Sequence, residues 1–457
     1  MTEHEQTPTT STDRPPRDFV TVWGGQTLSL IGTEITAVAV SFVAFLQTGS
    51  LTWLATLYLA IRVPALLVAS HAGGLVDRWS ARRVLLGADV VAGGASTTAL
   101  ALHLAGSLRL WHLVVLSAMG SLANAYQMTA YQAAVPRLVP TAALPRAHGL
   151  LQLTQAAGLL VAPATAGLLV GTGGIGLVLV LDVLTFVVAV TATSSADFGS
   201  AQVAHSPGGD VADGPADRHG EGGVRATWRH LREHHRPGLR RLVVWGALVN
   251  VALTTLNLML PALLLSTVSE TTAGFTLTAG GVAMLVASLA VSARGLPDRL
   301  VTTLVGATAV VGLGVLLVGL RPHIGLTGVG VVVALAAAPV VGAAANTLHQ
   351  REIELDWQGR MAALRRIAAE VLVLPTVVVL SPVVERVVAP SMSDDGWLSE
   401  LTGWALGTGA GREYGLMIVL AGVAVVAVAV AMSRDDELGE LNAPSRTDEA
   451  VHASAVR

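Results

Sequence analysis

The sequence predicts an all-α membrane protein with twelve transmembrane helices in two pseudo-symmetric six-helix bundles. The chain of 457 residues is 52% hydrophobic and only 13% charged, whereas soluble domains carry about 25% charged residues. Its apolar runs approach roughly 20 residues, the length at which a helix crosses a ~30 Å hydrocarbon core. A polar stretch at residues 193–241 separates six such runs from six more.

The apolar runs define the expected domains. The first six lie at residues 19–46, 52–75, 84–105, 110–134, 146–170 and 175–192. The second six lie at residues 242–265, 274–293, 300–320, 325–348, 362–384 and 414–432. We therefore expect a disordered cytoplasmic tail at 1–18, an N-terminal bundle at 19–192, a cytoplasmic linker at 193–241, a C-terminal bundle at 242–432 and a second disordered cytoplasmic tail at 433–457.

The arginine residues predict the orientation. If the N-terminus is cytoplasmic, most arginines fall in cytoplasmic segments, and only Arg109, Arg321, Arg386 and Arg412 fall outside, with Arg62 inside the bilayer. Positively charged residues favour the cytoplasmic side of a membrane. The chain is rich in alanine and glycine and has no lysine, a composition typical of high-GC bacterial genomes. We expect a bacterial inner (plasma) membrane protein with both termini in the cytoplasm.

Composition also excludes several kinds of chemistry. The chain has no cysteine, which excludes disulfides and cysteine metal sites. The absence of lysine excludes a Walker A loop and a pyridoxal Schiff base. A net charge of −3 gives no reason to expect nucleic-acid binding. We expect no enzymatic activity, no cofactor and no metal site, and we expect any active transport to use an ion gradient or a separate ATPase.

The linker contains a basic stretch at residues 225–236, in which Trp228 and Leu231 stand among arginines and histidines. Such a stretch fits a short basic helix on an anionic inner leaflet. It equally fits a solvated linker, and the sequence leaves both readings open.

The turn after the second apolar run carries a motif, because residues 73–83 read GGLVDRWSARR. A glycine here allows close helix approach, and the arginines can pair with the neighbouring aspartates at the inner leaflet. This motif resembles the signature of the major facilitator superfamily between its second and third helices. The resemblance implies a transporter that works by alternating access, with a conformational lock at this turn. The lock would consist of Gly73, Asp77, Arg78, Arg82, Arg83 and Asp89.

Further stretches resemble the drug and siderophore exporter branch of this superfamily, which includes enterobactin-exporter-like proteins. They are the WGGQ at residues 23–26, the VPRLVP at 135–140 and the GLLVAPATAG at 158–167. The last is similar to the antiporter motif of the fifth helix, through Gly158, Pro163 and Gly167. The resemblance implies proton-coupled efflux.

Ionisable residues inside apolar runs are the candidates for proton coupling, because charge is costly there. Glu34 lies about 15 residues into the first run, and Arg62 lies about 13 residues before the end of the second, so we expect them to face each other near the midplane. Glu34 is either a proton site or one half of a permanent ion pair with Arg62. Asp182 is a further proton-coupling candidate, or else it bonds a neighbouring helix.

Polar residues at helical spacings are candidates for the wall of a substrate cavity. Steps of three, four or seven residues place side chains on one face of a helix, although polar residues also hold membrane helices together. The cavity candidates are Trp23, Gln26, Thr27, Asn124, Gln127, Tyr131, Gln155, Asn250 and Asn257.

The predicted function is that of a secondary active transporter. It would exchange protons for a small amphipathic molecule, such as an antibiotic, a siderophore or a peptide natural product, and would work as a monomer in the lipid bilayer. Two alternatives with the same fold are a nutrient importer and a lysolipid flippase. An alternative from another class is a membrane scaffold or receptor that transports nothing.

Overall fold

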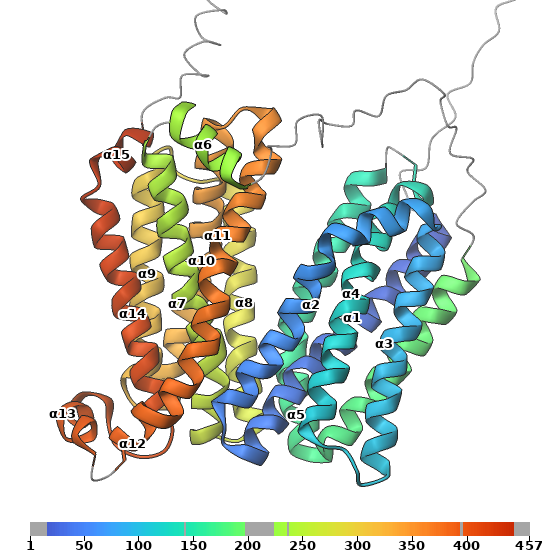
Figure 1. The fold of residues 1–457 in the computed structure, drawn as a ribbon, viewed down its shortest axis with the longest axis horizontal. Helices are drawn as coiled ribbons and strands as arrows, with labels where there is room; N and C mark the ends of the chain where they lie inside the picture. The colour runs from blue at the N-terminus through green and yellow to red at the C-terminus, as the bar shows by residue number, and fades with distance from the viewer. Residues whose placement is uncertain (1–15, 141–142, 197–223, 235–236, 394–395, 443–457) are drawn as a thin grey trace, which may run out of the picture. The chain divides into compact units, whose positions relative to one another are not determined.

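The structure is a computed structural model that describes residues 16–140, 143–196, 224–234, 237–393 and 396–442. Within these residues the regular structure is entirely helical (Figure 1). The predicted all-α class is therefore confirmed.

Five helices cover the region of the first six apolar runs. They are α1 (Arg17–Thr48), α2 (Leu51–Arg78), α3 (Ala81–Leu104), α4 (Leu110–Leu138) and α5 (Leu144–Ser195). α5 contains both the fifth and the sixth predicted span, which are two helical segments that meet at a kink where the backbone of Gly174 leaves the helical region with φ 68° and ψ −170°. Glycine adopts this conformation without the steric cost that a side chain would bring.

The second half of the chain begins with a short helix that precedes the next span. Its helices are α6 (Val224–His234), α7 (Pro237–Thr267), α8 (Glu270–Arg294), α9 (Leu300–Leu320), α10 (Ile324–Glu352), α11 (Leu355–Val383), the π-helix η2 (Val384–Val388), α12 (Ala389–Ser391), α13 (Trp397–Leu406), α14 (Arg412–Ser433), α15 (Asp436–Gly439) and the 3-10 helix η3 (Glu440–Asn442). Each of the six later apolar runs coincides with one of the helices α7, α8, α9, α10, α11 and α14.

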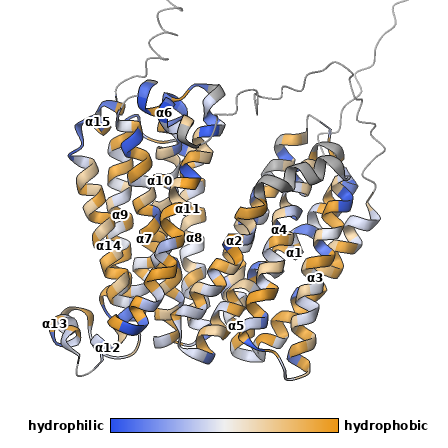
Figure 2. Cartoon of the chain, in the orientation of Figure 1, coloured by the Kyte–Doolittle hydropathy of each residue, from blue (hydrophilic) through white to orange (hydrophobic). Residues whose placement is uncertain are grey.

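Ten helices in the described part of the chain are long and apolar enough to cross a membrane. α5 accounts for two predicted spans, and α4 coincides with the fourth predicted run although it is not among the ten. Figure 2 shows hydrophobic residues along the lengths of these helices and hydrophilic residues gathered at α6 and α15. This distribution matches the apolar interior and polar surfaces of a bilayer.

Contacts divide the chain into two compact units. The first unit contains the described parts of Met1–Ala37, Ala60–Ala162 and Gly176–Gly209. The second unit contains the described parts of Val38–Leu59, Pro163–Ile175 and Asp210–Arg457. The helices α1, α2 and α5 each contribute to both units.

The second unit has a large apolar core to which both halves of the sequence contribute. Phe42 of α1 and Leu51 of α2 belong to the same buried cluster as Met259 of α7, Val315 of α9 and Ile418 of α14. All five side chains are no more than 1% exposed. Burial of such side chains stabilises a structure by about 1.5–3 kcal/mol each where the alternative is water.

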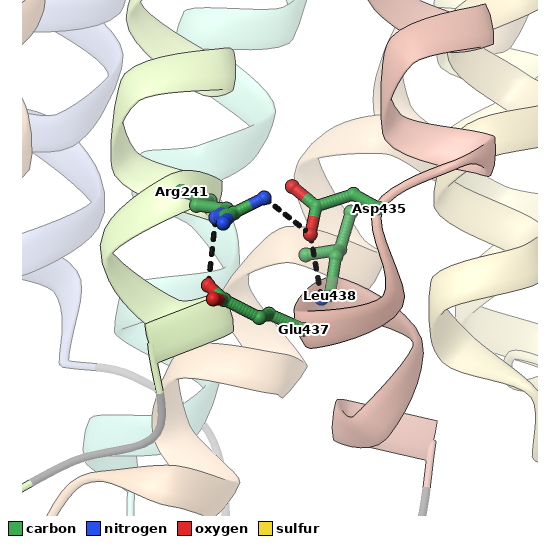
Figure 3. A network of polar contacts seen from close by, with 4 residues as sticks. All are labelled: Arg241, Asp435, Glu437 and Leu438. Carbon is green, nitrogen blue, oxygen red and sulfur yellow. Dashed lines mark hydrogen bonds and ion pairs between the residues drawn. The ribbon is translucent and has the colours of Figure 1, made fainter.

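Polar contacts fix the end of α7 that carries Arg241. One nitrogen of the Arg241 guanidinium lies 2.8 Å from Asp435 Oδ1 and its Nε lies 2.7 Å from Glu437 Oε2 (Figure 3). Asp435 Oδ1 also accepts a hydrogen bond of 3.2 Å from the backbone N–H of Leu438, which caps α15. The segment after α14 is therefore held against the start of α7.

Candidate functional site

The side chain of Glu34, on α1, interacts with residues of α2 and α5 in the first unit. A Cβ atom built on Gly158 of α5 would lie 3.3 Å from Glu34 Cγ, so the glycine leaves room for this side chain. Arg62 of α2 lies within electrostatic range of Glu34. Both charged side chains are exposed in the structure. Glu34 of α1 and Arg62 of α2 are therefore two accessible side chains of opposite charge that interact within the first unit.

The backbone next to Arg62 is tied to a neighbouring helix. The Ser121 hydroxyl of α4 donates a hydrogen bond to the Ile61 carbonyl. Pro64, one turn further along α2, has no N–H group and so cannot donate to the carbonyl four residues before it. Contact with α4 thus supports α2 at the point where its own hydrogen-bond ladder is interrupted.

Asp182 lies on a different side of α1 from Glu34. Its Oδ2 accepts a hydrogen bond of 2.5 Å from Ser96 Oγ of α3, and its Oδ1 lies 3.1 Å from the Cβ position of Gly32. Gly32 and Glu34 are two residues apart, which is roughly 200° around a helix. The structure therefore does not bring Asp182 to the Glu34–Arg62 pair, and the Asp182 side chain is only 2% exposed.

Asp89 sits in a closed network of buried amides. Gln26 Nε2 donates to Asp89 Oδ2 at 2.8 Å, and Gln127 Nε2 donates to Asp89 Oδ1 at 2.7 Å. Gln127 Nε2 also donates to Gln26 Oε1 at 2.7 Å, and Gln26 Nε2 donates to Thr193 Oγ1 at 3.1 Å. Each amide NH₂ group has two hydrogens, and both are used. The network joins α1, α3, α4 and the end of α5, and it leaves neither glutamine amide with a hydrogen to donate to a substrate.

Trp23 and Thr27 form the contact between α1 and α5. The Trp23 indole N–H donates to the Leu150 carbonyl at 3.2 Å and to Thr154 Oγ1 at 3.1 Å. The hydroxyls of Thr27 and Thr154 lie 2.7 Å apart. Tyr131 is buried, and its hydroxyl has no hydrogen-bond partner among the residues that the structure describes.

The remaining cavity candidates are accessible. Gln155 is exposed on α5, one turn before Gly158 and hence near Glu34, and Asn124 on α4 is half-buried. In the second unit Asn250 and Asn257 are both exposed, two turns apart on one face of α7. These are the polar side chains that remain open to a ligand in each unit.

The predicted conformational lock falls partly outside the described residues. The side chains of Gly73, Asp77 and Arg78 in α2 lie outside the described part of the structure. The Arg82 guanidinium donates to the Ser194 carbonyl at 2.5 Å. Ser80 caps α3 by accepting a hydrogen bond from the Arg83 backbone N–H at 3.4 Å.

Of the helix-five motif, Pro163 and Gly167 lie against α8 within the second unit, whereas Gly158 belongs to the first unit and lies next to Glu34. A Cβ atom on Gly167 would overlap the Glu270 carbonyl, and one on Gly274 would overlap the Pro163 carbonyl. The Ala164 backbone N–H donates to Thr278 Oγ1 of α8 at 3.0 Å. The backbones of α5 and α8 touch here, and only glycine permits this approach.

Glu385 in η2 caps the start of α2, and we call this set of contacts the Glu385 cap. Its Oε1 accepts hydrogen bonds from Ser50 Oγ at 2.6 Å and from the Thr52 backbone N–H at 2.8 Å. Its Oε2 accepts from Thr52 Oγ1 at 2.7 Å. Tyr414 of α14 adds a hydrogen bond of 3.3 Å to the Gly49 carbonyl.

Sequence reasoning did not single out Glu385, Thr154, Ser96 or Thr193. A short hydroxyl side chain in an apolar run was the available signal for Thr154 and Ser96, because such groups often bond a neighbouring membrane helix, whereas Thr193 lies just beyond the sixth run. Among the described residues no group of three or more His, Cys, Asp or Glu side chains could hold a metal ion.

The sequence profile of the Major Facilitator Superfamily matches residues 22–373. This chain belongs to that superfamily. It is therefore a multi-pass membrane transporter of small molecules and not an enzyme.

Solved structures of other transporters share the fold. A bacterial homologue of the human lysosomal transporter Spinster has a TM-score of 0.66 at 12% identity, over 94% of this chain and 98% of that one. A bacterial homologue of the iron transporter ferroportin has a TM-score of 0.63 at 15% identity, over 92% of this chain and 98% of that one. A nucleoside transporter also has a TM-score of 0.63, at 11% identity, over 91% and 98% of the two chains.

A relative in sequence is Macrolide efflux protein A of Streptococcus pyogenes, which is 32% identical over 124 residues. The match covers 27% of this chain and 30% of that protein. The chain thus matches less than a third of the length of this relative.

Proposed function

We propose that this major facilitator protein exports a small amphipathic molecule, such as an antibiotic, a siderophore or a peptide natural product, in exchange for protons. The observation that carries the proposal is the position of Glu34. It is an exposed carboxylate inside a membrane-spanning helix, within electrostatic range of Arg62 and packed on Gly158.

This arrangement gives Glu34 two competing states. An apolar surrounding favours a neutral carboxyl, while a nearby guanidinium favours a carboxylate. A change in the distance or the solvation of Arg62 would shift the balance between them. If alternating access changes that environment, Glu34 takes up a proton on one side of the membrane and releases it on the other.

The substrate would contact the accessible polar side chains. Gln155 lies on α5, one turn before the Gly158 that contacts Glu34 of α1, and Asn250 and Asn257 lie on one face of α7. Aromatic residues make up only 4% of the chain, while 52% of it is hydrophobic, so we expect mostly aliphatic walls around these side chains. Such walls suit an amphipathic molecule with a few hydrogen-bonding groups.

The direction of transport and the orientation of the chain in the membrane are part of the same proposal. Efflux is supported by the partial match to a protein named for macrolide efflux. The distribution of arginines supports a bacterial inner membrane location with both termini in the cytoplasm. Alternating access would occur by rearrangement of the two halves of the fold, as secondary transporters require.

The test is proton-driven transport into inverted membrane vesicles, screened over compounds that the host produces. We expect Glu34→Gln to abolish the dependence of transport on the pH gradient, since an amide cannot carry a proton. Glu400→Gln, the same change at an exposed residue of α13, is the matched control and should leave transport intact.

Other outcomes would support other functions. Full pH-driven transport by Glu34→Gln would refute the role of Glu34. Substrate accumulation in intact cells would indicate a nutrient importer, and transfer of lysolipid between leaflets would indicate a flippase. A scaffold or receptor would show no flux in either the wild-type protein or the variant.

A further inference from the structure

The short helix α6 is fixed to the rest of the second unit by one of its faces. Thr227 and Leu231, one turn apart, are 5% and 1% exposed. The His230 ring stacks on Trp357 of α11, with centroids 3.6 Å apart and planes 5° apart. The Arg360 guanidinium lies 4.8 Å from the centroid of the same Trp357 ring. These contacts set the rotation of α6 about its own axis.

The other face of α6 is exposed and basic. Trp228, Arg229 and Arg232 are all exposed, and Trp228 is 37% accessible although it is a large aromatic residue. Trp228 and Arg232 are one turn apart on one stripe of the helix, and Arg229 lies beside them. Glu233 borders this face and is the one acidic residue of the helix. We call Trp228, Arg229 and Arg232 the basic face of α6.

The basic face lies at the level where the membrane spans end. α7 begins at Pro237, shortly after α6 ends at His234, and the apolar segment of α11 begins at Trp357, which His230 contacts. Figure 1 places α6 at the same end of the second unit as α15. Tryptophan and arginine are the side chains that favour the headgroup layer of a bilayer.

We propose that the basic face of α6 binds the headgroups of anionic phospholipids in the leaflet at which these spans end. An arginine can give two parallel hydrogen bonds to a phosphate, and the indole ring suits the boundary between headgroups and acyl chains. The attraction follows from charge complementarity, because an anionic membrane surface attracts basic residues within about 10 Å. The contacts of Leu231 and His230 keep this face turned away from the protein core.

The cysteine-free sequence allows a direct test. A single cysteine introduced as Glu233→Cys would carry a spin label next to the basic face, in otherwise full-length protein in lipid nanodiscs. The measurement is the ratio of label collisions with oxygen and with a water-soluble nickel chelate. We expect the ratio to rise about twofold when phosphatidylcholine is partly replaced by phosphatidylglycerol, because α6 is drawn into the headgroup layer.

The double variant Arg229→Gln and Arg232→Gln should lose this rise. Its matched control is Arg294→Gln with Arg299→Gln, which removes the same charge from the exposed connection between α8 and α9 and should keep the rise. The first residues of α9 share a buried cluster with Leu231 of α6. The two arginines of the test variant and the two of the control therefore lie at the same end of the second unit.

Three results would overturn the proposal. One is equal accessibility in neutral and anionic nanodiscs, which would indicate a solvated helix. Another is an equal loss in both double variants, which would indicate an effect of net charge alone. The third is the same rise on addition of inorganic phosphate to neutral nanodiscs, which would indicate a site for soluble phosphate. Both leaflets of a nanodisc have the same lipid composition. The test therefore does not depend on the orientation of the protein in the membrane or on whether it transports a substrate.

Discussion

Removal of the Glu385 side chain should weaken the docking of the α1–α2 connection within the second unit. Three hydrogen bonds of 2.6 to 2.8 Å end on this carboxylate. A hydrogen bond to a charged group is worth about 1.5–3 kcal/mol. Thr52 is exposed, while Ser50 and Glu385 are half-buried, so water replaces part of each bond. We expect Glu385→Ala to lower the free energy of unfolding by about 1–3 kcal/mol in total.

A double-mutant cycle separates the Glu385 cap from other effects of the substitution. The partner change is Ser50→Ala with Thr52→Ala, which removes both hydroxyl donors and leaves the backbone N–H groups of Leu51 and Thr52. Unfolding in mixed detergent micelles would give each free energy. The two changes should couple by about 1–2 kcal/mol, because both remove the same hydrogen bonds. Arg386→Ala, at the exposed neighbour of Glu385, is the control and should couple by less than about 0.3 kcal/mol. If the Glu385 cycle gave a coupling as small as that of the control, the cap would contribute nothing to docking.

Two further predictions concern buried contacts. Gly274→Leu should prevent the close approach of α5 and α8 and abolish transport. The control is Gly246→Leu, because the Cβ position of Gly246 has no neighbour within 4 Å, and this variant should transport normally. Normal flux by the Gly274 variant would contradict the contact. Asp89→Asn should destabilise the first unit by about 1–3 kcal/mol. The new NH₂ group would face the amide NH₂ of Gln26 or Gln127, and neither group can accept a hydrogen bond from the other. A melting temperature equal to that of the wild type would refute this interpretation of the network.

The positions of the spans could be predicted from the sequence because the length of a membrane helix is set by the bilayer. Every predicted apolar run coincides with a helix, and the run at 414–432 differs from α14 (Arg412–Ser433) by one or two residues at each end. The helix α13 was not predicted, since its ten residues are too short to give a membrane signal. The predicted gap between the runs at 146–170 and 175–192 coincides with the kink at Gly174 that separates the two helical segments of α5.

The surroundings of individual polar residues were harder to predict. Spacing along a helix shows that residues share a face, but it does not show which neighbour covers that face. Gln26 and Gln127 were therefore placed at a substrate cavity by the same reasoning that selected Gln155, although the structure buries the first two against Asp89 and exposes the third. Glu385 lies in the π-helix η2, where wider turns shift the direction of side chains from that of a regular α-helix. The spacing of residues along a regular helix could therefore not have predicted the contact of Glu385 with Ser50.

The three residues of the proposed proton site share a further property. Glu34, Arg62 and Gly158 belong to the first unit, and each lies within a turn of the residue at which its helix passes between units, namely Ala37, Ala60 and Ala162. α1, α2 and α5 are continuous through these points. If alternating access changes the helix geometry at these points, as the proposed function requires, the separation of Glu34 from Arg62 would change with it. In the proposed mechanism a proton on Glu34 would in turn remove its attraction to Arg62, so protonation and movement would each affect the other, and this reciprocity is what coupling of protons to transport requires.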